Sequence, residues 1–450
     1  MKIGFFGGTR SVTGANFWIE ANGHQFLVDC GLTQGASFCD ACNFDPFPYN
    51  PKDIKGVFLT HAHEDHCGRL PKLVNDGYIG PIYANAPTRD LTELNLLDSA
   101  GLMVYEHKKF KQRLLFQEND VRRTMKQFKI FGKHASFEPA KGVRVSVLDS
   151  GHILGSSMYL IEAEGKRVLF TGDLGNSPNP ILPELETVTD VDYVVMESVY
   201  GDRIHERKDH KRMDDLENAI EQVATQKGVL MIPAFAIERT QELLFELNYL
   251  VENKKVPHMP FFVDSPLAIS MTKQFIKHQD FLNDAFKQQL TGDPNLFTFP
   301  GLTFTETTEQ SKAINELEAP KVIVAGSGMS NGGRILHHER RYLSDPNSIL
   351  LVVGYQTHGS LGRRLQKGEK SVHIYGEEVI VKATVMTLES YSAHADQEKL
   401  AEWTGHFRHS VKRVFLAMGE AEAAETFATL VRDAQLIDAQ VPEANQIVQL

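Results

Sequence analysis

The sequence has few cysteines, no long apolar run and no excess of positive charge. Four cysteines in 450 residues are too few to suggest a disulfide framework. The chain contains no run of about 18 or more apolar residues, the length needed to span a membrane. The first residues, MKIGFFGGTRSVTG, lack the pattern of a secretory signal. We therefore expect a cytoplasmic protein with no membrane-spanning segment.

Acidic residues outnumber basic ones. The 47 Lys and Arg against 58 Asp and Glu give a net charge of −11, which argues against broad, non-specific attraction to nucleic acid. A nucleic-acid substrate would need a local basic surface. The candidate cations for it crowd one region: Arg334, Arg340, Arg341, Arg363, Arg364 and Lys367. Solvated surface charge is the commoner explanation of such a cluster.

Two of the cysteines, Cys39 and Cys42, form a C-x-x-C pair. No second pair and no partner histidines lie at the spacing of a zinc ribbon, so a structural or redox role for this pair stays open. Cys30 and Cys67 fall within segments that also carry candidate metal ligands. Their position there is a further reason to expect no disulfide.

The chain changes character twice. Residues 1–202 are dominated by short β runs such as KIGFF, NFWIE, HQFLVD and VRVSVLD, with helix formers between about 70 and 127. Residues 203–377 alternate helices with continuous apolar strands such as GVLMIP and SILLVVG, which is typical of a parallel sheet. Residues 378–450 return to β runs and a final helix. No linker marks either boundary, so we expect an α/β unit inserted into a discontinuous first unit.

The strongest motif is His61-Ala62-His63-Glu64-Asp65-His66, an HxHxDH pattern directly after the apolar run GVFLT. Three imidazoles and a carboxylate at this spacing suit zinc and allow one loop to serve two ions. His152 follows the run VRVSVLD, and Asp173 follows RVLF. Alone, each would more often be a core histidine or a turn residue. Together with HxHxDH they predict a larger ligand set.

These motifs, with Asp29 in LVDCG, resemble those of the metallo-β-lactamase superfamily in order and spacing. The resemblance implies an αββα sandwich. It implies that one zinc is held by His61, His63 and His152, and a second by Asp65 and His66, with Asp173 between them. Asp29 would orient the ligand loop. Asp29 and the ligand Asp65 therefore both count among the expected catalytic residues. Zinc lowers the pKa of a bound water to about 7 and thereby provides a nucleophile.

Beyond Asp173 the chain resembles the β-CASP family, in the branch that contains the pre-mRNA cleavage and polyadenylation endonuclease. The matching segments are VVMESVYGDR, IPAFAIERTQELL, VDSPLA, GSGMSNGGR, VGYQTHGSLGRR and SAHAD. The resemblance implies an inserted β-CASP domain and an acid pair of Glu197 and His394. A carboxylate beside an imidazole keeps the imidazole protonated, as a general acid requires. Each residue alone could have a purely structural role.

The glycine-rich segment GSGMSNGGR follows the strand KVIVAG. It could be a simple turn, but successive backbone N–H groups there can form an anion-binding nest. We therefore expect contact with substrate phosphate from this segment. The candidate residues are Ser327, Gly328, Met329, Ser330, Asn331 and Arg334.

One position departs from the family pattern. Met418 in LAMGE stands where the third β-CASP motif has a histidine. A thioether is a poor zinc ligand among imidazoles and carboxylates, so we expect weaker binding of the zinc at Asp65 and His66. Reduced or altered activity is a second expectation from this substitution, but we still expect an active hydrolase.

The resemblance implies a zinc-dependent ribonuclease, most simply an endoribonuclease, that hydrolyses single-stranded RNA in a cleft between two domains. Two alternatives stay open: a hydrolase of small substrates, and an RNA-binding protein whose catalysis is weakened at Met418. The sequence does not determine the RNA target or whether cleavage begins at an end. Self-association into a homodimer is an expectation from the family alone.

Overall fold

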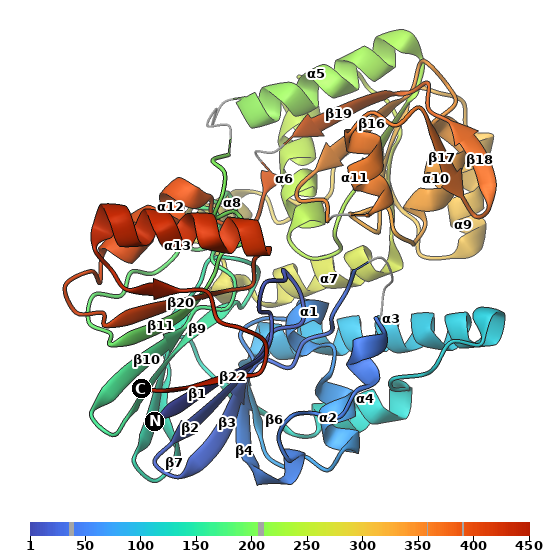
Figure 1. Cartoon of the computed structure of the whole chain (residues 1–450). Helices are drawn as coiled ribbons and strands as arrows, with labels where there is room; N and C mark the ends of the chain where they lie inside the picture. Colours follow the sequence, from blue (N-terminus) through green and yellow to red (C-terminus); the bar gives the residue numbers. More distant parts are fainter. Residues whose placement is uncertain (36–39, 206–210, 358, 389–390) are drawn as a thin grey trace.

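The computed structural model describes residues 1–35, 40–205, 211–357, 359–388 and 391–450. It has two units, a layered unit formed by both ends of the chain and an α/β unit between them (Figure 1). The two termini lie side by side, because the last strand pairs antiparallel with the first. Within the described ranges no helix is long and apolar enough to cross a membrane.

Two seven-stranded sheets stack face to face in the layered unit. The first has the order β22 (Gln446–Gln449), β1 (Lys2–Gly7), β2 (Asn16–Ala21), β3 (His24–Val28), β4 (Ile54–Phe58), β5 (Ile82–Asn85), β6 (Phe128–Phe131). The second has the order β21 (Ala439–Gln440), β20 (Arg413–Ala417), β11 (Tyr193–Glu197), β10 (Lys166–Phe170), β9 (Ser157–Ala163), β8 (Val143–Asp149), β7 (Ser136–Ala140). Phe5 and Phe415 meet in the core between the sheets, with ring centroids 5.2 Å apart.

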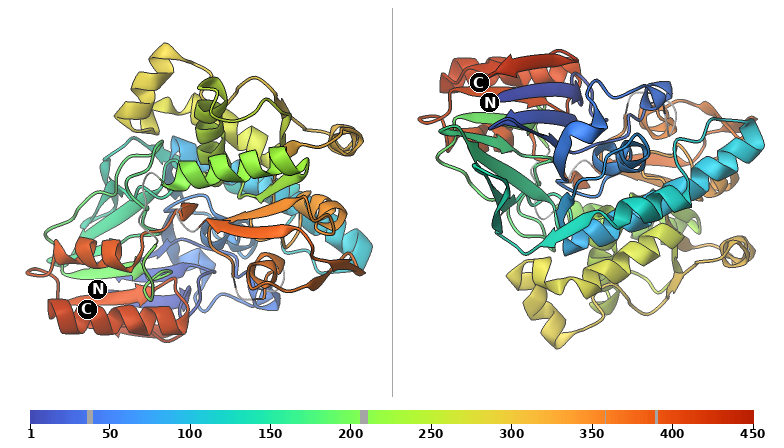
Figure 2. Two further views of the ribbon diagram at one scale, coloured as in Figure 1. Left: turned by 90° about the horizontal axis from the view of Figure 1, so that it is seen from above. Right: turned by 90° about the horizontal axis from the view of Figure 1, so that it is seen from below.

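Helices cover the outer face of each sheet (Figure 2). Leu96 and Met103 pack against the first sheet, and Trp403 and Phe427 pack against the second. These four layers confirm the expected αββα sandwich, because each sheet buries both faces. The helices are α1 (Glu64–Cys67), α2 (Leu70–Asn75), α3 (Ala86–Phe110), α4 (Glu118–Met125), α12 (Gln397–Gly405) and α13 (Ala421–Gln435).

The inserted unit contains a six-stranded sheet in which all neighbours are parallel. Its order is β14 (Leu302–Phe304), β13 (Phe261–Asp264), β15 (Lys321–Ala325), β12 (Val229–Pro233), β16 (Ile349–Val353), β19 (Thr384–Leu388). Apolar clusters lie on both faces of the sheet, which explains the continuous apolar strands. The helices are α5 (Lys211–Gln226), α6 (Arg239–Glu252), α7 (Pro266–Lys277), α8 (Asp284–Gly292), α9 (Thr308–Ala313), α10 (Ile335–Tyr342) and α11 (Leu361–Gln366). β17 (Ser371–Ile374) and β18 (Glu377–Ile380) form a separate hairpin.

The layered unit is discontinuous in sequence. Strand β20, after the insertion, pairs parallel with β11, before it, and this pairing sets Glu197 opposite Ala417. The segment boundaries remain predictions, but β19 pairs with β16 of the inserted unit. By strand pairing, Thr384–Leu388 therefore joins the sheet of the inserted unit. The apolar pattern of residues 379–388 predicts strands without revealing which sheet they join.

Candidate metal centre

The candidate ligands gather at one edge of the sandwich because the strands that precede them end there. β3 and β4 are parallel, and β8 runs in the same direction as β10, since both flank β9 antiparallel. Each strand is followed within three residues by a candidate side chain. In order along the chain these are Asp29, His61, His152 and Asp173.

The first group of ligand atoms comes from His61, His63, His152 and Asp173. His63 Nδ1 lies 3.1 Å from His61 Nε2 and 3.3 Å from His152 Nε2. Asp173 Oδ2 lies 3.5 Å from the Nε2 atoms of His61 and His152. A tetrahedral zinc with bonds of about 2.0–2.1 Å has ligand atoms about 3.3 Å apart. The spacing of the group therefore fits one zinc ion.

A second group lies on the other side of Asp173. His66 Nε2 is 3.3 Å from Asp173 Oδ1 and 3.8 Å from Asp65 Oδ2. The two oxygens of Asp173 thus face different groups. His66 Nε2 and Asp173 Oδ1 are buried, and neither has a hydrogen-bond partner among the described residues. Such atoms are costly to bury unless something coordinates them, so the second group also fits a cation.

The protonation of the histidines agrees with ligand roles. Burial lowers the pKa of His61, and lowers that of His63 and His152 well below the ordinary value. These imidazoles are therefore neutral, which is the form that binds metal. Burial would also lower the pKa of His66, but the carboxylates of Asp173 and Asp29 raise it well above the ordinary value. A metal ion at His66 would replace this proton.

Asp29 holds the second group in place. Its Oδ1 accepts from the Thr60 backbone N–H at 2.8 Å, and its Oδ2 accepts from the Thr60 hydroxyl at 2.7 Å. Oδ2 also lies 2.7 Å from His66 Nδ1, which leaves His66 Nε2 directed at Asp173. His152 is held in the same way, with Nδ1 3.3 Å from the carbonyl oxygen of Ala393. Such partners fix the ring orientation of a metal-bound histidine.

Replacing Asp29 by asparagine is expected to weaken metal binding by about 10- to 100-fold, because the amide keeps the shape but loses the charge that holds His66. Competition with a chromophoric chelator measures this affinity. The matched control is Asp433→Asn at an exposed position, which should leave the affinity unchanged. An unchanged affinity in Asp29→Asn would contradict the supporting role of Asp29.

Glu197 and His394 form a pair beside the ligand groups. Glu197 Oε1 lies 3.1 Å from His394 Nδ1 and accepts from the Leu174 backbone N–H at 2.6 Å. The His394 ring lies 4.6 Å from the His152 ring, between centroids. The segment that carries His394 meets the loop after Asp173 through a β-bridge between His394 and Gly175. The pair thus combines residues from before and after the insertion.

Charge keeps the His394 imidazole protonated. Burial alone would lower its pKa, but the Glu197 carboxylate, by charge and hydrogen bond, raises it to about 9. Burial raises the pKa of Glu197, and His394 opposes that rise. Divalent cations at Asp173 would lower the pKa of His394 again, because nearby positive charge disfavours imidazolium.

The inserted unit anchors the segment of His394 through Tyr391. The Tyr391 hydroxyl donates to Glu246 of α6, and the Arg212 guanidinium of α5 lies 4.4 Å from the centre of the Tyr391 ring. Arg212 in turn forms an ion pair with Glu246. These groups are largely buried, so they couple the inserted unit to the position of His394.

Comparisons with known proteins agree with this geometry. The pattern of the Metallo-beta-lactamase superfamily matches residues 12–234, the Beta-Casp domain matches 240–365, and the Zn-dependent metallo-hydrolase RNA specificity domain matches 378–442. Ribonuclease TTHA0252 of Thermus thermophilus is 36% identical over 94% of this chain and 94% of its own. The chain belongs to the β-CASP family of the metallo-β-lactamase superfamily. It is therefore a metal-dependent hydrolase, and the family supports divalent-metal binding, for which the His and Asp cluster is the candidate site.

More distant relatives span this β-CASP chain as well. Transcription termination factor FttA of Methanosarcina mazei is 28% identical over 96% of this chain and 69% of its own. The RNase J-like protein of Methanocaldococcus jannaschii is 26% identical over 99% and 98%. A crystal structure from Enterococcus faecalis, described as a protein of unknown function, covers 100% of the chain and 99% of its own at 12% identity, with a TM-score of 0.56. That likeness concerns the fold alone.

The expected phosphate-binding segment is a loop between β15 and α10. Three of its backbone N–H groups are already used, because Ser327 donates to Gly332 O at 3.2 Å, Ser330 donates to Ser327 O at 3.1 Å and Asn331 donates to Ser327 Oγ at 3.0 Å. For the N–H groups of Gly328 and Met329, the described part of the chain offers no acceptor. The Phe235 ring lies so close that a Cβ on Gly328 would be 2.6 Å from it. An anion nest in this loop would therefore rest on the N–H groups of Gly328 and Met329.

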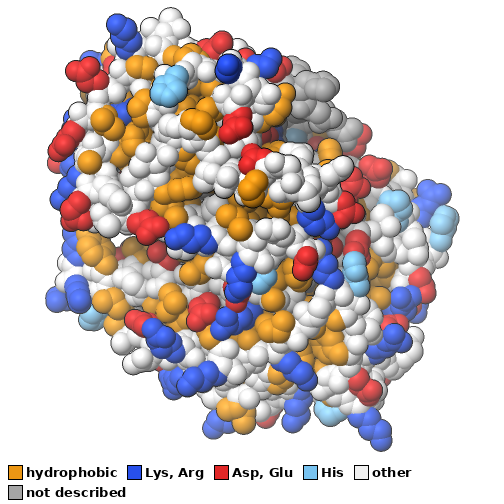
Figure 3. Space-filling model, turned by 180° about the vertical axis from the view of Figure 1, so that it is seen from behind, with side chains coloured by type: hydrophobic (Ala, Val, Ile, Leu, Met, Phe, Trp, Pro, Cys, Tyr) orange, Lys and Arg blue, Asp and Glu red, His pale blue; other side chains and the backbone are white. Residues whose placement is uncertain are grey.

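The basic residues of the β-CASP unit are mostly engaged by protein groups. Arg334 Nη1 lies 2.7 Å from Asp264 Oδ1, and the guanidinium also donates to two backbone carbonyls, so it supports the loop. Arg340 pairs with Glu377, and Arg364 with Glu369. Arg341 and Arg363 donate to Asn315 and Gln366. Figure 3 shows basic and acidic side chains interspersed on the rear face. Substrate contact by Arg334 and its neighbours remains a prediction.

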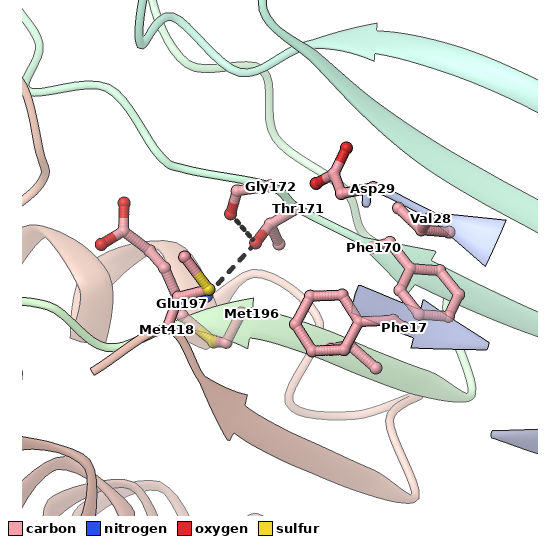
Figure 4. A pocket seen from close by; sticks show the side chains of 10 residues that line it. Phe17, Val28, Asp29, Phe170, Thr171, Gly172, Met196, Glu197 and Met418 are labelled. Atoms are coloured by element: carbon pink, nitrogen blue, oxygen red, sulfur yellow. Dashed lines mark hydrogen bonds between the residues drawn. The ribbon is translucent and has the colours of Figure 1, made fainter. Parts of the chain in front are cut away.

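Met418 lies in the apolar core beside the second ligand group. It follows β20, is 2% exposed, and donates its backbone N–H to Gly8 O at 2.6 Å. Its side chain borders a cavity of about 10 Å³, room for about one water, that Asp29, Thr171 and Glu197 also line (Figure 4). No imidazole reaches the centre from this position.

None of the cysteines within the described ranges belongs to the ligand groups. Cys30 and Cys67 are buried free thiols, and Cys42 is an exposed free thiol. Burial raises the pKa of Cys30 to about 11, so this thiol stays protonated and inert. Cys39 lies outside the described residues, so the role of the C-x-x-C pair stays open.

Proposed function

We propose that this β-CASP protein is a zinc-dependent ribonuclease that hydrolyses single-stranded RNA where its two units meet. The observation that carries the proposal is that Asp173 directs one carboxylate oxygen toward each ligand group. The Glu197 and His394 pair lies beside these groups. The names of the relatives, a ribonuclease and a transcription termination factor, support RNA as the substrate. The expected location is the cytoplasm.

Each part of the site has a distinct task in this proposal. Two zinc ions, at His61, His63 and His152 and at Asp65 and His66, would activate a water and stabilise negative charge on the phosphate. His394 keeps Nδ1 on Glu197, which leaves Nε2–H to protonate the leaving ribose oxygen. Glu197 stabilises the imidazolium before this transfer. The N–H groups of Gly328 and Met329 would position a neighbouring phosphate.

The test is cleavage of one RNA, labelled separately at its 5′ and 3′ ends, with and without zinc and with His63→Ala as the control. Internal fragments that require zinc and His63 support an endoribonuclease, and stepwise release of 5′ nucleotides supports an exonuclease. Absence of cleavage under every metal condition would overturn the proposal. Turnover of nitrocefin or a thioester would then favour a small-substrate hydrolase, and metal-independent RNA binding would favour a binding protein. Sedimentation tests the expected homodimer.

Mild chelation is expected to remove the zinc at Asp65 and His66 first, leaving about one zinc per chain, because Met418 supplies no imidazole there. Met418→His should raise the zinc content retained after chelation, and Met418→Leu serves as the apolar control. Metal analysis after gel filtration measures both. Retention of two zinc ions by the unaltered protein would refute the expectation.

A further inference from the structure

The distal end of α3 carries aromatic side chains that are unusually open to solvent. Tyr105 is 55% exposed and Phe110 is 59% exposed. Neither is needed in the core of the layered unit, which α3 covers with Leu96, Ala100 and Met103. Exposed groups of large apolar side chains commonly mark an interaction site.

Positive charge surrounds these rings. The segment YEHKKFKQR, residues 105–113, contains four Lys and Arg against one Glu, in a chain whose net charge is −11. Lys109 Nζ lies 5.4 Å from the centre of the Tyr105 ring and 5.0 Å from that of Phe110. Lys108 and Lys111 are exposed, and neither forms an ion pair within the described part of the chain. The acidic chain thus concentrates unpaired positive charge here.

The inserted unit extends this surface. Figures 1 and 2 show the distal end of α3 beneath the β17–β18 hairpin. Tyr375, between these two strands, is 49% exposed and packs against His337 with ring centroids 4.9 Å apart. Burial raises the pKa of Tyr375, and Lys109 lowers it, so charge on α3 acts on this ring. Aromatic rings of both units therefore border one basic region.

The region lies apart from the metal centre, but the helix that carries it, α3, also contacts the HxHxDH segment. Ser99 of α3 donates to Glu64 Oε1, within the HxHxDH loop, at 2.5 Å. Phe110 follows eleven residues later, which corresponds to about 16 Å along a helix. An RNA that contacts both this region and the metal centre must span about this distance.

We propose that the surface formed by Tyr105, Lys108, Lys109, Phe110, Lys111 and Tyr375 binds single-stranded RNA outside the metal centre. The inference rests on the proposed function and adds a second place of contact. Bases of any sequence stack on aromatic rings while lysines contact the phosphates, as single-stranded RNA requires. A second copy of this chain fits less well, because a symmetric contact would set the lysines of both copies against each other.

Two double variants separate the contributions. Tyr105→Ala with Phe110→Ala removes stacking, and Lys108→Ala with Lys111→Ala removes charge. Tyr249→Ala with Lys254→Ala is the control, because it removes an exposed ring and an exposed lysine of the inserted unit. Binding of an RNA of about 20 nucleotides is measured by fluorescence anisotropy in a His63→Ala background, which prevents cleavage.

Loss of stacking is expected to weaken binding at least about tenfold. Loss of the two lysines should lower the slope of log affinity against log salt by about 1.4, at about 0.7 per phosphate contact. The control should bind normally. In the cleaving protein, the aromatic variant should raise KM for the long RNA and leave cleavage of an RNA of about four nucleotides unchanged.

The outcomes distinguish this surface from the proposed function. Unchanged binding in both double variants overturns the surface and leaves the ribonuclease proposal intact. RNA binding that weakens in the double variants, without cleavage of any RNA by the unaltered protein, supports the surface and overturns the ribonuclease proposal. No binding by the unaltered protein overturns both. A dimer that dissociates in the aromatic variant, with normal RNA affinity, would assign the surface to a second copy.

Discussion

Alanine in place of Asp173 is expected to lower RNA cleavage by at least about 10²-fold. The reason is its position: Oδ2 faces His61 and His152, and Oδ1 faces His66. Metal content should fall below that of the unaltered protein, because both ligand groups lose an oxygen. Metal analysis and cleavage of end-labelled RNA measure the two effects on the same preparation.

The control for this replacement is Asp190→Ala. Asp190 pairs with Arg167 at the surface with its side chain 76% exposed, so its removal should change neither metal content nor cleavage. Full metal content and full activity in Asp173→Ala would contradict a bridging role. Retained metal with lost activity would instead restrict Asp173 to positioning the substrate.

Alanine in place of His394 is expected to lower kcat for RNA by about 10²- to 10⁴-fold, the usual contribution of a general acid. The metal content should stay unchanged, because neither of the two expected ligand sets includes this residue. Steady-state cleavage kinetics and metal analysis test the two statements. His409→Ala, an exposed histidine on the same unit, is the control.

The leaving group decides whether His394 acts as an acid. A phosphodiester with a p-nitrophenolate leaving group needs no proton from the enzyme, so His394→Ala should lose less than about tenfold with it. Equal losses on both substrates would exclude a proton-donating role. Loss of metal from His394→Ala would make this histidine a ligand, since Asp173, Glu197 and His394 also lie within 4.8 Å of one another.

The sequence predicts the main features of the fold because they follow from local patterns. Short β runs indicate a strand-rich first segment, and continuous apolar runs indicate the parallel sheet, whereas the stacking of two sheets is expected from the family resemblance. The candidate metal ligands stand out in the sequence because HxHxDH is short and each further candidate closely follows a strand. The membership of β19 is not predictable in this way, because its pairing with β16 depends on the path of the intervening chain.

Other features of the site carry no sequence pattern. Thr60 and Ala393 contribute a hydroxyl and a carbonyl oxygen, which become visible only through their contacts with Asp29 and His152. The basic residues near Arg334 are conspicuous in the sequence, yet most of them are engaged by neighbouring protein groups. The exposed rings of α3 show the opposite case. Burial, not composition, separates a ring in the core from one in solvent.

The pairing of β20 with β11 also determines when the protein can act during its synthesis. A ribosome-attached chain that has emerged only as far as Asp173 already carries every expected metal ligand, but it lacks His394 and the strand that completes the second sheet. Because chains fold progressively from the N-terminus as they emerge, His394, the proposed general acid, joins the site last. While the growing chain is still held on the ribosome next to its own messenger RNA, it therefore cannot yet cleave RNA.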